Sequence, residues 1–287
     1  MKTRAKNRIW ELDFLRGFAI LMVLVDHGMF NFFSVFDGWG VSGNSFLEFL
    51  NSTGLAYVNS DIRVFWRPAF LFLFFCTSGL CTAFSRNNFL RGIKLAFVAM
   101  LLSLVTYIAD KTFIPDSFVM FGVLHCMAAI ILIYSLVAFI VEMSVKIGFK
   151  LARRQFDDRV YKYVLSGICL VLAIGFFFIN KKYNVGFIDA TGYFQTVDTG
   201  SKFLGLFFYA DNWWTSDYFP LFPFISFFFF GAFLAPLLYP KKKSLLPCLD
   251  GVWHTPFTFP GRHSLAVYLF GQLIILAICA ALDAILL

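Results

Sequence analysis

Apolar residues along this chain gather into long runs that polar segments separate. Seven runs are long enough to cross a bilayer, which takes about 20 helical residues. They cover approximately residues 14–36, 67–85, 93–109, 118–141, 163–180, 217–238 and 263–286. A segment inside hydrocarbon must satisfy its own backbone hydrogen bonds, and a helix does so. The pattern predicts an all-α, polytopic membrane helix bundle of about seven transmembrane helices.

The charges between the runs predict which end of each helix is cytoplasmic. Basic residues dominate the amino-terminal tail and three later segments (86–94, 142–162 and 241–262). Carboxylates gather in 37–66 and 110–116, and 181–216 is mixed. Basic loops remain in the cytoplasm. All seven crossings then agree with a cytoplasmic amino terminus and an outer carboxyl terminus.

Composition supports the same class. The chain has 287 residues, of which 60% are hydrophobic and 14% charged, with a mean hydropathy of +0.76. We expect one domain over 1–287, in contact with lipid, in the plasma membrane. The net charge of +7 follows the cytoplasmic loops, so no nucleic-acid partner is expected. No CxxC spacing occurs, and neither a disulfide framework nor a metal site is predicted.

Three segments between the runs have more than a connecting role in this prediction. The 37–66 segment is apolar in places and is expected to lie at the outer interface. Basic and apolar residues alternate over 146–162, which predicts an amphipathic helix on the cytoplasmic surface. The run 203–209 is too short to span and is expected to be re-entrant or interfacial.

Ionisable residues inside the first run are the strongest functional signal. Arg16 and His27 are eleven residues apart. Helical steps of about 100° bring them to within ~20° of each other, ~16 Å apart along the axis. His27 would lie ~20 Å from the cytoplasmic boundary, or ~10 Å below the outer one. Such residues are costly in hydrocarbon, so a functional site is the default interpretation.

A second histidine and a carboxylate extend this hypothesis. His125 enters the fourth run from outside and reaches the same predicted depth as His27, so the two could share one cavity. The alternative is that each satisfies a neighbouring carbonyl. Asp26 lies about 100° around the helix from His27, which predicts that it pairs with a donor on another helix. A proton relay through these three residues is a further alternative.

Charged residues also mark the two predicted membrane faces. On the cytoplasmic side, Arg16, Arg86, Arg91 and Lys94 are expected to converge on a phosphate-bearing ligand, although the positive-inside rule alone accounts for the last three. Asp13 and Arg16 are spaced to pair. On the outer side, the carboxylate and aromatic groups of 211–220 suit a sugar or an ordinary interfacial belt. His263 and Ser264 are expected to cap the last helix or to touch a cytosolic ligand.

Several motifs together resemble a known family. They are Arg8-Ile9-Trp10-Glu11-Leu12-Asp13-Phe14-Leu15-Arg16-Gly17, Asp26-His27, Ser78-Gly79, Ser85-Arg86-Asn87-Asn88, Phe121-Gly122-Val123-Leu124-His125, Asp217-Tyr218-Phe219-Pro220 and Gly261-Arg262-His263-Ser264-Leu265. In this order they resemble the small bacterial form of the heparan-alpha-glucosaminide N-acetyltransferase catalytic-domain-like family. Related chains often carry a His-Gln pair in the last span, whereas Gly271 precedes Gln272 here.

The resemblance implies transfer of an acetyl or other acyl group from cytosolic acyl-CoA to an amino sugar or glycan across the membrane. It maps the family's catalytic histidine onto His27 and its companion arginine onto Arg16. In the mechanism that we expect, His125 orients the acceptor or polarises the carbonyl. The CoA donor is assigned to Arg16, Arg86, Arg91, Lys94 and Ser78, and the acceptor to Asp26, Asp217 and Tyr218.

The chemistry at His27 has two versions, and the function has two rivals. His27 would act as a general base, since an unperturbed imidazole titrates near ~6.5, or would carry the acyl group covalently. The rival functions are a proton-coupled transporter that uses Asp26, His27 and His125 as a relay, and a non-catalytic membrane component. The acceptor, the acyl length and the oligomeric state, including a homodimer, remain open.

Overall fold

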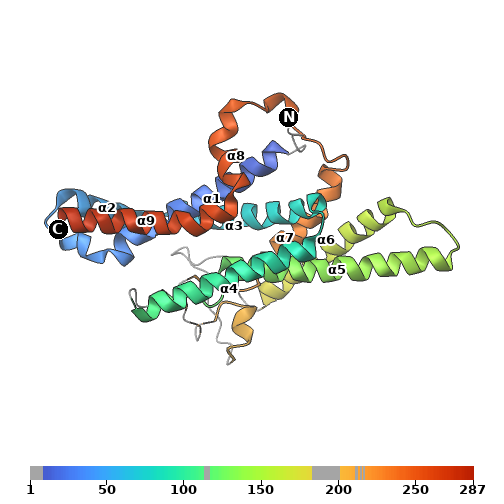
Figure 1. Ribbon diagram of the computed structural model, residues 1–287, viewed down its shortest axis with the longest axis horizontal. Helices are drawn as coiled ribbons and strands as arrows, with labels where there is room; N and C mark the ends of the chain where they lie inside the picture. The colour runs from blue at the N-terminus through green and yellow to red at the C-terminus, as the bar shows by residue number, and fades with distance from the viewer. Residues whose placement is uncertain (1–8, 113–116, 183–200, 211–212, 214, 216) are drawn as a thin grey trace. The chain divides into compact units, whose positions relative to one another are not determined.

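The computed structural model describes residues 9–112, 117–182, 201–210, 213, 215 and 217–287 (Figure 1). Within these residues the regular structure is helical. The helices are α1 (Trp10–Phe30), α2 (Ser45–Val58), α3 (Asp61–Leu80), α4 (Asn88–Thr112), α5 (Val123–Leu151), α6 (Asp158–Lys182), α7 (Phe224–Leu238), α8 (Thr255–Arg262) and α9 (Ser264–Leu286), and a π-helical turn, Asn31–Val35, extends α1.

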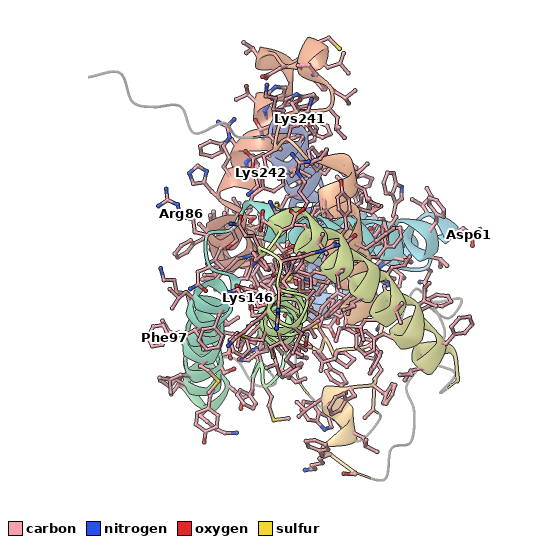
Figure 2. The ribbon with its side chains drawn as sticks, turned by 90° about the vertical axis from the view of Figure 1, so that its right-hand side faces the viewer. Asp61, Arg86, Phe97, Lys146, Lys241 and Lys242 are labelled. Carbon is pink, nitrogen blue, oxygen red and sulfur yellow. The ribbon has the colours of Figure 1, made fainter. Side chains whose placement is uncertain are left out.

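Six helices of the described chain are long and apolar enough to cross a membrane. These are α1 with its π-helical turn, α3, α4, α5, α6 and α9. Their outer surfaces are apolar: the Phe97 side chain on α4 is 71% exposed and points away from the ribbon (Figure 2). This confirms the prediction of an all-α membrane protein in contact with lipid. The orientation of the amino terminus remains a prediction.

The predicted run 217–238 is only partly helical. The helix α7 has 15 residues, about 22 Å, and begins at Phe224. The preceding segment, 217–223, is not helical, and its buried backbone is paired: the amides of Phe219, Leu221 and Phe222 donate to carbonyls of Phe121, Leu206 and Phe207 at 2.9–3.1 Å. Pro220 and Pro223 have no amide to donate. Apolar composition alone did not reveal this change, because a non-helical backbone is stable here only through these partners.

The prediction of an amphipathic helix over 146–162 is wrong. Helix α5 continues to Leu151, a turn follows, and α6 begins at Asp158, so this segment is the junction of two long helices. Arg153 adopts a left-handed conformation in the turn (φ 53°). The alternation of basic and apolar residues reflects the two helix ends instead. In the 203–209 run, Leu204–Leu206 form a short 3-10 helix.

The chain divides into two compact units, which we describe separately. The first contains the described residues of 1–74 and 243–287, with α1, α2, α8 and α9. The second contains those of 75–186 and 194–242, with α4 to α7. Helix α3 contributes residues to both. That the whole chain forms a single domain remains a prediction.

Two glycines allow α1 and α8 to pack backbone against backbone in the first unit. A Cβ on Gly17 would lie 1.7 Å from the carbonyl oxygen of Phe257, and a Cβ on Gly261 would lie 1.7 Å from that of Asp13. Neither position can accept a side chain without separating the helices. The Arg16-Gly17 and Gly261-Arg262 motifs therefore meet in space, and this contact fixes the start of α1.

We expect Gly17→Ala to lower the thermal stability of the detergent-purified protein by several degrees, because overpacking at a rigid backbone contact costs about 1–3 kcal/mol. Gly28→Ala is the matched control on the same helix: its nearest neighbour would be Ile275 at 3.9 Å. Alanine there should leave stability unchanged or slightly higher. Equal melting temperatures for both variants would contradict the close contact between α1 and α8.

The amino-terminal end of α1 is attached to the segment before α8. The buried Glu11 carboxylate accepts hydrogen bonds from the Ser244 hydroxyl (2.9 Å) and the Leu245 amide (2.6 Å). The Trp10 indole stacks on His254 with ring centroids 4.5 Å apart. The predicted topology assigns the start of α1 and residues 241–262 to the same membrane face, and these contacts agree with that assignment.

The other end of the first unit joins the 37–58 segment to the end of α9. Trp39, Leu47 and Cys279 form a buried cluster. The Trp39 indole donates to Asp283 at 2.7 Å. The carboxyl-terminal half of α9 therefore lies beside the 37–58 segment, as the predicted topology requires. The 37–66 segment, predicted to lie at the interface, folds largely as α2 and the start of α3.

The second unit has its own glycine contact, between the end of α3 and α7. A Cβ on Gly79 would lie 2.0 Å from the carbonyl oxygen of Phe228, and one on Gly231 would lie 2.0 Å from that of Cys76. Helices α4 and α5 pack along each other, as do α6 and α7 (Figure 1). The Ser78-Gly79 motif thus lies at a helix crossing.

Candidate active site

Arg16 and His27 lie on one uninterrupted helix. Helix α1 runs from Trp10 to Phe30, so the predicted helical spacing of the two residues holds. Both side chains are half-buried. The π-helical turn begins four residues after His27, and such turns occur frequently at functional sites. The geometry places a guanidinium and an imidazole along one side of α1, ~16 Å apart.

His27 lies on the side of α1 that packs against α9. Leu24 touches the position of Gly271, Gly28 faces Ile275, and Asn31 accepts a hydrogen bond from Gln272 at 3.5 Å. Residues 24, 28 and 31 follow the i, i+4, i+7 spacing of one helix face, and residue 27 falls within it. The last helix thus borders the face that carries the imidazole.

Asp26 points into a different cluster, formed with α2 and α3. Its carboxylate accepts a hydrogen bond from Arg63 Nε at 2.8 Å, lies 3.9 Å from Arg67 Nε, and is 3.3 Å from the Tyr57 hydroxyl. Arg63 is 1% exposed. Burial and the neighbouring carboxylate raise the pKa of Tyr57 to about 12. The prediction that Asp26 pairs with a donor on another helix is confirmed.

Sequence reasoning missed Arg63 as a partner, because it counted that residue among the charges of an outer loop. The available signal was its position four residues before Arg67, which places two guanidinium groups on one helix face. A buried carboxylate in α1 needs such a counter-charge. The pairing gives Asp26 a clear structural role, and its predicted contact with the acceptor remains a prediction.

His125 caps the amino terminus of α5. The Gly122 amide donates to Nδ1 at 3.3 Å, so Nδ1 is unprotonated and Nε2 carries the proton. Nε2 then donates to Ser103 Oγ at 3.0 Å, and the Ser103 hydroxyl donates to the Val119 carbonyl at 2.7 Å. Both ring nitrogens are therefore used in local structure. His27 and His125 belong to different units, so their shared cavity remains a prediction.

Asp217 and Tyr218 hold loop structure in the second unit. The Asp217 carboxylate accepts from the Val123 amide at 3.2 Å, in the first turn of α5, where carboxylates are favourable. The Tyr218 hydroxyl lies 2.6 Å from the Gly205 carbonyl and 2.8 Å from that of Phe208. Burial raises the pKa of Tyr218 to about 12. Asp217 and His125 thus both accept backbone amides at the amino-terminal end of α5. Asp211, which belongs to the same 211–220 segment of the sequence, lies outside the described residues.

Two residues of the predicted CoA site meet in the second unit. Arg91 donates to Ser78 Oγ at 2.6 Å and to the Ser78 carbonyl at 3.4 Å. Arg86 and Lys94 are exposed, and Arg86 projects away from the ribbon (Figure 2). Arg16 belongs to the other unit, so the convergence of these residues on one ligand remains a prediction.

Asp13 pairs with an arginine from the other end of the chain, and its predicted pairing with Arg16 remains a prediction. Asp13 accepts from Arg262 Nε at 3.2 Å, beside the contact of Gly17 with α8. His263 precedes α9 without capping it through its side chain, and its Nδ1 lies 3.0 Å from the Phe259 carbonyl. The first and last motifs of the sequence thus form one structural junction.

The family described as "Heparan-alpha-glucosaminide N-acetyltransferase, catalytic" matches residues 8–273, which is nearly the whole chain. The chain belongs to this family. No curated protein and no solved structure matches it. Membership in this acetyltransferase family confirms the resemblance drawn from the motifs and indicates a membrane-bound transferase. The matched region runs through both compact units.

Proposed function

We propose that this protein transfers an acetyl or other acyl group from cytosolic acyl-CoA to an amino sugar or glycan on the outer side of the plasma membrane. Arg16 binds the donor through a phosphate, and His27 removes a proton from the acceptor as it attacks the thioester, or carries the acyl group itself. Arg86, Arg91, Lys94 and Ser78 complete the donor site, and Asp217 and Tyr218 contribute to that of the acceptor. The observation that carries this assignment is the family match over a chain whose first helix places Arg16 and His27 on one side.

The base is assigned to His27 because the contacts of His125 oppose that role. A general base must present an unprotonated nitrogen to the acceptor. In His125 the unprotonated Nδ1 accepts the Gly122 amide, and Nε2 carries the proton toward Ser103. A base at His125 would have to break the cap of α5. An orienting role for His125 toward the acceptor remains a prediction.

The contacts of Asp26 argue against the alternative function, a transporter with a proton relay through Asp26. A relay carboxylate must gain and lose protons during each cycle. Asp26 is paired with the buried Arg63 at 2.8 Å, so a relay through Asp26 would have to break this ion pair in each cycle. Together with the family match, this supports an enzyme over a proton-coupled transporter.

Binding of the donor can be measured directly. We expect acetyl-CoA to raise the melting temperature of the detergent-purified protein, because a ligand of the folded state stabilises it by about 2.7 kcal/mol at 100 times its dissociation constant. Desulfo-CoA and ATP serve as controls for the thioester and for the nucleotide. Arg16→Ala should abolish the shift.

Gly28→Ala is the matched variant on α1 for this experiment, since it alters the same helix without removing a charge. It should keep the full acetyl-CoA shift. If neither acetyl-CoA nor a longer acyl-CoA stabilises the wild-type protein, the proposed donor is wrong. If Arg16→Ala responds like the wild type, the donor lies elsewhere.

A further inference from the structure

Two amide side chains, one buried and one half-buried, meet one helical turn beyond His27. Asn31 begins the π-helical turn, and its backbone amide donates to the His27 carbonyl. Its side chain is 2% exposed. Gln272 reaches it from α9 and donates through Nε2 to Asn31 Oδ1 at 3.5 Å. The pair links α1 to the last helix beside the imidazole.

This pair leaves one donor and one acceptor without partners. Asn31 Nδ2 and Gln272 Oε1 are both buried and make no hydrogen bond within the described part of the protein. If both side-chain amides were rotated by 180°, their nitrogen and oxygen atoms would change places. One N–H group and one carbonyl oxygen would still lack a hydrogen-bond partner. Most buried polar groups in proteins have hydrogen-bond partners, so these two unpaired atoms indicate that a bound group completes the site.

We infer that Asn31 and Gln272 form a subsite that binds a hydroxyl group of the sugar acceptor next to His27. A hydroxyl both donates and accepts one hydrogen bond, so a single group satisfies both leftover atoms. It would donate to Gln272 Oε1 and accept from Asn31 Nδ2.

The position of the pair along α1 assigns it to the acceptor. This step rests on the proposed function, in which the donor occupies the Arg16 side of His27. Asn31 lies on the opposite side of His27, ~6 Å farther along the helix. A sugar held there would present a neighbouring amine or hydroxyl to the imidazole.

Access to the pair is compatible with its burial. Asn31 is held in the backbone turn, but Gln272 is only half-buried and has a flexible side chain. It comes from α9, which has the smallest share of buried residues among the candidate spans of the described chain. Rotation of the Gln272 side chain would break its contact with Asn31 without unfolding either helix.

The test uses the full chain in detergent, with glucosamine as the probe and sucrose as the control for nonspecific stabilisation by sugars. The apparent melting temperature is followed against sugar concentration for the wild type and for Asn31→Leu/Gln272→Met. We expect glucosamine, and not sucrose, to stabilise the wild type. The dissociation constant should rise roughly tenfold or more in the double variant, as for the loss of two hydrogen bonds.

The stability of the double variant without sugar is the second readout. Replacing both partners by apolar groups of similar size removes two unsatisfied atoms, so the melting temperature should be equal or higher. A large decrease, or failure to fold, would show that the pair is structural and would overturn the inference. Equal glucosamine affinity in both proteins, or no stabilisation of the wild type by glucosamine, would overturn it as well.

The acetyl-CoA experiment separates this inference from the proposed function. A protein that binds acetyl-CoA through Arg16 but loses no glucosamine affinity in the double variant contradicts the subsite and keeps the transferase. A protein that binds glucosamine through the pair but never binds an acyl-CoA keeps the subsite as a hexosamine site and contradicts the transferase.

Discussion

Replacing His27 with alanine is expected to lower kcat/KM for acyl transfer by about 10²–10⁴, the usual contribution of a positioned acid–base group. The physical reason is that α1 carries this imidazole beside the α9 contact, whereas His125 uses Nδ1 at the cap of α5 and Nε2 in a hydrogen bond to Ser103. The measurement follows radiolabelled acetyl-CoA into glucosamine with detergent-purified protein.

Val25→Ala is the matched control, because Val25 is on the same helix at nearly the same depth and is 44% exposed. It should keep wild-type activity. Label that stays on the wild-type protein after denaturation, and is absent from His27→Ala, would select the covalent acyl-histidine route over direct transfer. Wild-type turnover by folded His27→Ala would remove this residue from the chemistry.

The long helices could be predicted from the sequence because hydropathy over about 20 residues reports bilayer length directly. The helical relation of Arg16 to His27 follows from the rise and turn of the helix, and α1 preserves it. The charge pattern also predicts which segments share a membrane face. The contact of Trp39 with Asp283 and that of Glu11 with Ser244 agree with it.

The sequence could not show where hydropathy misleads. Residues 219–223 of the 217–238 run are apolar yet not helical, because the amides of Phe219, Leu221 and Phe222 donate to carbonyls far along the chain. Arg63 has the same charge as a loop arginine, and only tertiary structure reveals its burial against Asp26. The Asn31–Gln272 pair joins residues 241 positions apart, which no local pattern contains.

The motifs gain a common explanation once their contacts are known. Gly17 meets the helix that ends at Arg262, and Ser78 meets Arg91. Asp217 and His125 both accept backbone amides at the amino-terminal end of α5. Much of what looked like separate functional signatures is therefore the packing that holds α1, α5 and α8 in place.

The largest loss of stability is expected from Arg63→Met. Breaking a buried ion pair from one side costs about 3–5 kcal/mol, since the remaining charge stays in an apolar environment. Arg63 is 1% exposed and lies 2.8 Å from Asp26. The apparent melting temperature of the Arg63→Met protein should fall by roughly 5–15 °C. Arg67→Met is the matched control, because Arg67 lies 3.9 Å from the carboxylate, and its effect should be markedly smaller.

The double variant Asp26→Leu/Arg63→Met tests what the pair is for. Replacing both charges with apolar side chains removes the buried carboxylate together with its partner, so most of the lost stability should return. If the double variant also transfers acyl groups at the wild-type KM for the sugar, Asp26 acts only by fixing α1 against α2 and α3. If it is stable and its sugar KM rises, Asp26 contacts the acceptor as well. A melting temperature for Arg63→Met within a degree or two of the wild type would contradict the buried pair, since the carboxylate would have lost its nearest cation without a cost in stability.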